Sequence, residues 1–101
     1  MAILEFRKNG KAIDCLYKLI DFYIDEVKNC ADEKDLKDCI NNFYRESTEL
    51  IASFKLDANM IQVLSHRISE EIVVLVQLYN INKQAWTARL EVQPLHLLLK
   101  L

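Results

Sequence analysis

Glycine and proline, the strongest turn-forming residues, are scarce in this chain of 101 residues, because Gly10 is its only glycine and Pro94 its only proline. A two-sheet sandwich needs a turn about every ten residues, and most turns use Gly, Pro, Asn or Asp. Hydrophobic residues make up 51% of the sequence, which is enough to build a core in a chain of this length. The sequence therefore predicts an all-α protein with a single helical domain over residues 1–101.

Apolar residues recur every three or four positions along most of the chain, the spacing that places them on one face of an α-helix. The predicted helices span residues 11–29, 32–54, 57–79 and 83–93. Asp32 and Asp57 begin the second and third of these, where a carboxylate can cap the first backbone N–H groups. Val73-Val74 widens the apolar face of the third helix, so we expect that helix to be central. Asn9-Gly10 and the stretch 80–82 are the expected breaks.

Both ends of the chain are harder to interpret. Proline costs roughly 3 kcal/mol in a helix interior, so we expect the C-terminal segment to be broken near Pro94. Beyond it, residues 95–101 form either a short terminal helix or a strand with alternating leucines, and the preference of leucine for helices favours the first. Residues 2–6 form a helical turn or a brief strand. Four helices with one apolar face each predict an antiparallel four-helix bundle.

Composition limits the compartment and the partners. The formal net charge is −2 and no basic stripe occurs, so we expect no nucleic-acid binding. No run of 18 apolar residues exists, so we expect no membrane span. The odd number of cysteines, three, without a CxxC pair or a leader sequence, predicts a reduced cytoplasmic protein.

The three cysteines are Cys15, Cys30 and Cys39. Cys15 and Cys30 are roughly 22 Å apart along one predicted helix, too far for a disulfide bond. Cys30 and Cys39 flank a connection and could approach each other, but we favour their being two buried small hydrophobic residues.

Catalytic and metal-binding patterns are absent from the sequence. Only two histidines are present, without an HExxH motif, and one glycine cannot build a phosphate-binding loop. His66 and Glu70 are four residues apart on a predicted helix, which favours a solvated surface pair. We therefore expect no metal, no cofactor and no enzymatic activity.

The spacing of one arginine and one histidine near the C-terminus suggests a different class of function. Arg89 and His96 enclose six residues, which resembles the Arg-x(4–6)-His element of the HEPN family of all-helical ribonucleases. The resemblance implies an arginine and a histidine that position and protonate a scissile phosphate. The sequence departs from the family pattern at Leu90, where a polar residue usually follows the arginine, and at Pro94.

Acidic residues concentrate around the connection between the first and second predicted helices. Residues 21–38 contain seven acidic side chains and three lysines. Such a cluster attracts a basic protein and speeds its docking. The alternative is an ordinary solvated loop whose acids cap a helix. The candidate partner-binding residues, including two aromatic residues near element edges, are Asp25, Glu26, Asp32, Glu33, Asp35, Asp38, Tyr44 and Trp86.

These features predict a non-enzymatic helical interaction protein that binds and neutralises or regulates a protein partner. A small bacterial immunity protein, antitoxin or inhibitor is the expected type, with a basic toxin or nuclease as partner. The alternative is a homodimeric structural or regulatory module. The third helix and the C-terminus, with five leucines in its last seven residues, would close such a dimer.

Overall fold

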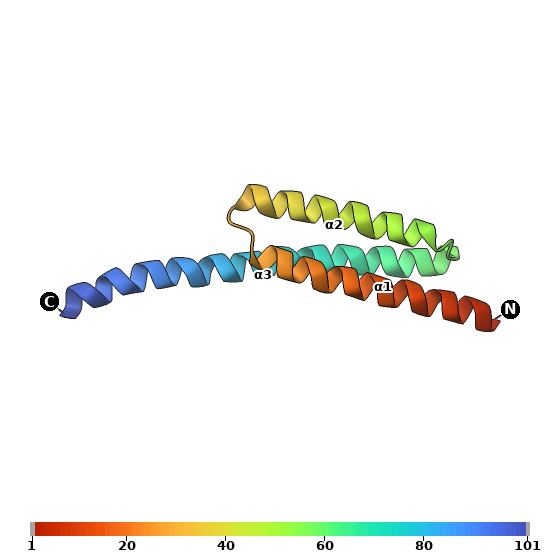
Figure 1. The fold of residues 1–101 in the computed structure, drawn as a ribbon, viewed down its shortest axis with the longest axis horizontal. Helices are drawn as coiled ribbons and strands as arrows, with labels where there is room; N and C mark the ends of the chain where they lie inside the picture. Colours follow the sequence, from red (N-terminus) through yellow and green to blue (C-terminus); the bar gives the residue numbers. More distant parts are fainter. Residues whose placement is uncertain (1, 101) are drawn as a thin grey trace.

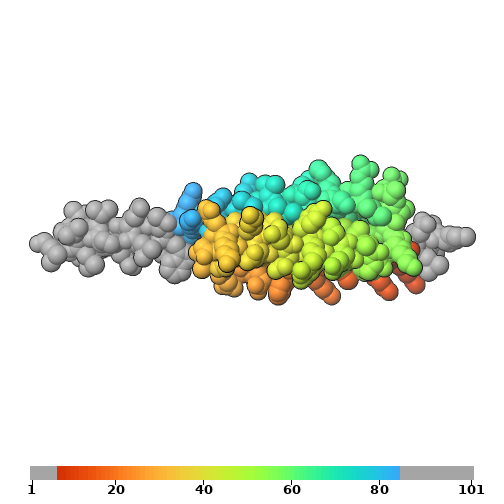
Figure 2. Space-filling model, turned by 90° about the horizontal axis from the view of Figure 1, so that it is seen from above, coloured from red at the N-terminus to blue at the C-terminus, as the bar shows by residue number. Residues whose placement is uncertain are grey.

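The computed structural model describes the backbone of residues 2–100 and the side-chain surroundings of residues 7–84. Over that backbone the chain forms three α-helices and no strand: α1 (Ala2–Lys28), α2 (Glu33–Ser53) and α3 (Ala58–Lys100). α1 and α3 run in the same direction, and α2 runs opposite to both (Figure 1). Figure 2 looks onto α2, with α3 along one of its sides and α1 along the other. The predicted all-α helical bundle is therefore confirmed.

The number of helices differs from the prediction, because the described backbone of α3 does not end at residues 80–82. The predicted fourth helix is instead the continuation of α3, so the predicted four-helix bundle is corrected to a bundle of three helices. An asparagine in a helix interior costs less than about 1 kcal/mol relative to alanine, and this stretch contains no proline to remove a hydrogen bond. The buried side chain of Tyr79 also holds the preceding turn against the bundle.

The C-terminal break is not observed either. The described backbone stays helical past Pro94 to Lys100, so it contains neither the predicted break nor the alternative strand. A proline removes one intrahelical hydrogen bond, but the leucines around it have among the highest helix propensities. The leucine side chains of the tail lie outside the described residues.

At the other end, α1 includes residues 2–6 and passes through Asn9-Gly10, where a break was expected. One glycine in a helix interior costs roughly 1 kcal/mol relative to alanine, which is too little to end a helix. Apart from its chain neighbours and the backbone of its own helix, no atom lies within 4 Å of the position that a Cβ atom on Gly10 would occupy. The site therefore has room for a methyl group.

Replacing Gly10 with alanine is expected to raise the free energy of unfolding by about 0.5–1 kcal/mol, because alanine loses less backbone entropy in a helix. Urea denaturation followed by circular dichroism measures the change. A lower stability in the variant would show that the chain is not helical at Gly10.

The two predicted helix caps are confirmed. Oδ1 of Asp32 accepts a hydrogen bond from the backbone N–H of Asp35 at 2.9 Å. Oδ1 of Asp57 accepts one from the backbone N–H of Met60 at 2.7 Å. Between α2 and α3, Lys55 takes the left-handed backbone conformation, with a φ of 51°, and turns the chain back. These two caps fix the starts of α2 and α3.

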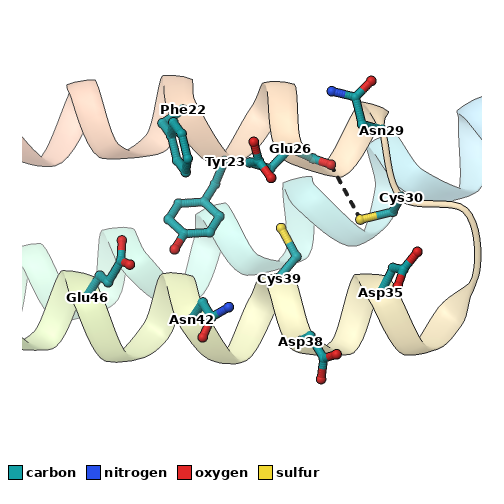
Figure 3. A pocket seen from close by; sticks show the side chains of 10 residues that line it. All are labelled: Phe22, Tyr23, Glu26, Asn29, Cys30, Asp35, Asp38, Cys39, Asn42 and Glu46. Carbon is teal, nitrogen blue, oxygen red and sulfur yellow. Dashed lines mark hydrogen bonds between the residues drawn. The ribbon is translucent and has the colours of Figure 1, made fainter.

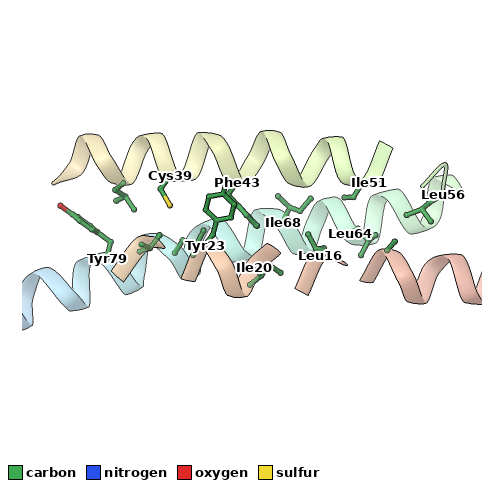
Figure 4. Close-up of a cluster of buried hydrophobic side chains, with 14 residues drawn as sticks. Leu16, Ile20, Tyr23, Cys39, Phe43, Ile51, Leu56, Leu64, Ile68 and Tyr79 are labelled. Carbon is green, nitrogen blue, oxygen red and sulfur yellow. The ribbon is translucent and has the colours of Figure 1, made fainter. Parts of the chain in front are cut away.

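The core lies between all three helices, as Figure 4 shows. Its central aromatic pair is Tyr23 of α1 and Phe43 of α2, whose rings meet edge to face with centroids 5.4 Å apart. Ser47 is fully buried on the apolar face of α2, and its Oγ donates a hydrogen bond to the carbonyl oxygen of Tyr44 at 3.1 Å. The buried apolar residues are Ala12, Leu16, Ile20, Tyr23, Val27, Leu36, Cys39, Phe43, Ile51, Leu56, Leu64, Ile68, Leu75 and Tyr79.

Candidate functional site

A groove of about 490 Å³ lies between α1 and α2, close to the connection that joins them (Figure 3). α1 and the residues directly after it form one wall, and α2 forms the other. The lining residues are Phe22, Tyr23, Glu26, Asn29, Cys30, Asp35, Asp38, Cys39, Asn42 and Glu46. We call this feature the acidic groove.

Helical periodicity explains why these residues meet. On α2, the lining positions 35, 38, 39, 42 and 46 follow one another at helical spacing and therefore share one face. On α1, positions 22, 23 and 26 do the same, and Asn29 and Cys30 follow directly after the helix. Tyr23 and Cys39 also belong to the buried core, so the groove is the polar margin of the α1–α2 contact.

The charge of the acidic groove has one sign. Four carboxylates line it, from Glu26, Asp35, Asp38 and Glu46, and no lysine or arginine is among the lining residues. The first three of these side chains are exposed, and Glu46 is half-buried. Carboxylates gathered along one groove concentrate negative potential there and attract cations.

Two of the four carboxylates lie beside a polar group of a neighbouring residue. Oδ2 of Asp35 accepts a hydrogen bond from the backbone N–H of Ala31 at 3.2 Å. The carboxylate of Glu46 lies near the hydroxyl group of Tyr23. Burial and, after it, this neighbouring carboxylate raise the pKa of Tyr23 to about 12. Tyr23 is therefore uncharged at neutral pH.

The two cysteines of the groove are thiols. Burial raises the pKa of the Cys39 thiol to about 12, and it also raises the pKa of Cys30. Sγ of Cys30 donates a hydrogen bond to the carbonyl oxygen of Glu26 at 3.4 Å. Nucleophilic catalysis requires a thiolate, and these surroundings disfavour the thiolate form.

The structure brings together only part of the predicted partner-binding set. Glu26, Asp35 and Asp38 line the acidic groove. Asp32 caps α2, and a carboxylate oxygen of Glu33 lies 3.8 Å from Nζ of Lys83. Asp25 and Tyr44 are not among the described residues that line the groove.

Asp25 is exposed on α1, where its backbone carbonyl accepts a hydrogen bond from the side chain of Asn29 at 3.2 Å. Tyr44 is 56% exposed on α2, and it is two residues from the lining position Glu46, which places it on a different side of the helix. The side chain of Trp86 lies outside the described residues.

The sequence-based set omits several lining residues, of which Glu46 carries a charge and Phe22 an exposed ring. The signal that identifies Glu46 is its spacing of four residues from Asn42, eight from Asp38 and eleven from Asp35. Those spacings place it on the same face of a helix.

Outside the acidic groove, the sequence raised the questions of a surface ion pair, of metal binding and of a catalytic arginine and histidine. His66 and Glu70 form an exposed pair, with Nε2 and Oε1 2.9 Å apart. Among the described residues, no group of three or more His, Cys, Asp or Glu side chains is arranged to hold a metal ion. Arg89 and His96 lie outside the residues whose side chains are described. Within the described part of the chain, no helix is both long and apolar enough to cross a membrane.

Comparison with known proteins gives no relative. No family model, curated protein or solved structure matches this chain.

Proposed function

We propose that this protein is a non-enzymatic interaction protein that binds a basic segment of a partner protein in the acidic groove. It would act by occupying the surface of that partner, as a small bacterial immunity protein, antitoxin or inhibitor does. The observation that carries the proposal is that four carboxylates and no basic residue line the groove. The three free thiols of the chain favour a reducing compartment such as the cytoplasm.

The lining chemistry suits an arginine or lysine side chain. Carboxylates bind guanidinium and ammonium groups through charge-assisted hydrogen bonds. Phe22 is 54% exposed and packs edge to face against Tyr23, with ring centroids 5.1 Å apart. Its free face can stack on a cation. Long-range attraction would also speed association at low salt.

A labelled peptide of alternating arginine and glycine residues tests this proposal by fluorescence anisotropy. We expect the affinity to fall as salt rises, and to fall at least about tenfold in a Glu26→Gln/Asp38→Asn variant, which removes two attractive charges. An Asp14→Asn/Asp21→Asn variant is the matched control, because both residues are exposed acids of α1 outside the groove. An affinity that does not change with salt concentration, or an equal loss of affinity in both variants, would contradict the proposal.

A second candidate function, a homodimeric module, is favoured by exposed apolar residues on α3. Val63, Val74 and Ile81 are 60%, 37% and 61% exposed, and their separations of eleven and seven residues place them on one helix face. We propose a second copy of the chain as the occupant of that face. Light scattering should then give a dimer for the full chain and a monomer for a Val74→Lys/Ile81→Lys variant. A monomeric full chain excludes this function.

A further inference from the structure

Two thiols occur together in the acidic groove and have no part in the proposed binding of a cation. Cys30 lies in the connection directly after α1, and Cys39 lies in the second turn of α2. Figure 3 shows both side chains projecting into the space between the two helices. Each thiol lies close enough to shift the pKa of the other: Cys30 raises the pKa of Cys39, and Cys39 lowers that of Cys30, which burial raises overall. Both are free cysteines.

The two cysteines of the groove differ in their surroundings. Cys30 follows the end of α1 and is half-buried, and its Sγ has one hydrogen bond, to the carbonyl oxygen of Glu26. Cys39 is fixed in α2 and is buried. A disulfide requires Cα atoms about 4.4–6.8 Å apart and side chains that point toward each other. Both thiols line the same groove and Cys30 lies outside the helices, so a change in the backbone of the connection can bring the two sulfur atoms together.

We propose that Cys30 and Cys39 form an intramolecular disulfide when the protein meets a low-molecular-weight disulfide, and that this bond locks the connection between α1 and α2. The proposal does not depend on the binding of a basic partner. It makes the width of the acidic groove sensitive to redox conditions, because one wall of the groove would then be tied covalently to the other.

Glutathione disulfide supplies the oxidant in two exchange steps. Cys30, the more accessible thiol, loses its proton to water and attacks one sulfur of glutathione disulfide, which releases one glutathione thiolate and leaves a mixed disulfide. Cys39 then loses its proton and attacks Sγ of Cys30, which forms the protein disulfide and releases the second glutathione. Two protein thiols are oxidised and one glutathione disulfide is reduced. Burial raises the pKa of both thiols, so the reaction should be slow at neutral pH and faster in alkaline buffer.

The test uses the full chain with a Cys15→Ser substitution, which leaves only the two thiols of the groove. After treatment with glutathione disulfide in alkaline buffer, intact-mass analysis should show the loss of two hydrogen atoms and no glutathione adduct. Peptide mapping should show a cross-link between Cys30 and Cys39. The melting temperature should rise on oxidation and return on treatment with dithiothreitol.

A Cys30→Ser variant that keeps Cys15 and Cys39 is the matched control, and it should give no internal cross-link because these two thiols do not share a groove. Three results would overturn the proposal: a stable glutathione adduct on Cys30 with Cys39 still free, cross-links between chains instead of within one, or no reaction at Cys39 in the folded protein.

Discussion

Replacing Phe43 with alanine should lower the free energy of unfolding by about 3–5 kcal/mol. Phe43 has no exposed surface and packs edge to face on Tyr23, so it joins α2 to α1 at the centre of the core. The substitution would remove buried apolar surface and leave a cavity that the surrounding helices fill only in part. Small domains are stable by only about 5–15 kcal/mol, so this loss is a large fraction of the total.

Urea denaturation followed by circular dichroism measures the loss. Phe22→Ala is the matched control, because Phe22 also packs against Tyr23 but is 54% exposed. That variant should lose less than about 1 kcal/mol, since much of its ring already contacts water. Similar losses in the two variants would mean that Phe43 is not at the centre of the core.

The sequence predicts the helix starts and the buried faces well, because both depend on strong local interactions. A carboxylate that accepts a hydrogen bond from a backbone N–H group, as in Asp32 and Asp57, marks the start of a helix whatever the tertiary structure is. The breaks are predicted poorly. Gly10 and the asparagines at 80 and 82 carry penalties of about 1 kcal/mol or less, and continued helical hydrogen bonding offsets penalties of that size.

The position of α3 in the bundle also could not be read from its sequence. A wide apolar face predicted a central helix, but Val73 is 55% exposed, and the three helices contact one another in every pairing. Periodicity shows which apolar residues share one face of a helix. It does not state which part of a wide apolar face the neighbouring helices cover.

Only part of the candidate site was predicted, because it too depends on how the helices pack against one another. Proximity in sequence groups Asp32 and Glu33 with the other acids of the first connection, but these residues cap α2 and approach Lys83. Glu46 is distant in sequence from the connection and lies in the groove because α2 is a regular helix packed along α1. Inter-helix packing decides which acids face one another, and that packing is a property of the whole fold.

Raising the pH from neutral to 12 should progressively destabilise the protein, through the buried Tyr23 and Cys39. Burial raises the pKa of each group to about 12, from 10.0 for a free tyrosine and 9.0 for a free cysteine. Between those values the unfolded chain has released the protons that the folded chain still holds, so stability falls as pH rises. The stabilising contribution is fully present below pH 9 and is lost as the pH approaches 12. Each group loses up to about 1.4 kcal/mol per pH unit in its window.

Urea denaturation at a series of pH values measures this loss, and the variants assign it. Cys39→Ala should be less stable at neutral pH because it loses buried volume. Tyr23→Phe should change the stability at neutral pH less, because it keeps the ring that packs on Phe43. The variant that carries both substitutions should lose less free energy of unfolding between pH 9 and pH 12. The Tyr44→Phe variant, which is changed at an exposed tyrosine, should lose stability with rising pH as steeply as the unsubstituted protein. An equally steep decline in the combined variant would show that other groups cause the alkaline unfolding, because neither buried proton would then remain to be lost.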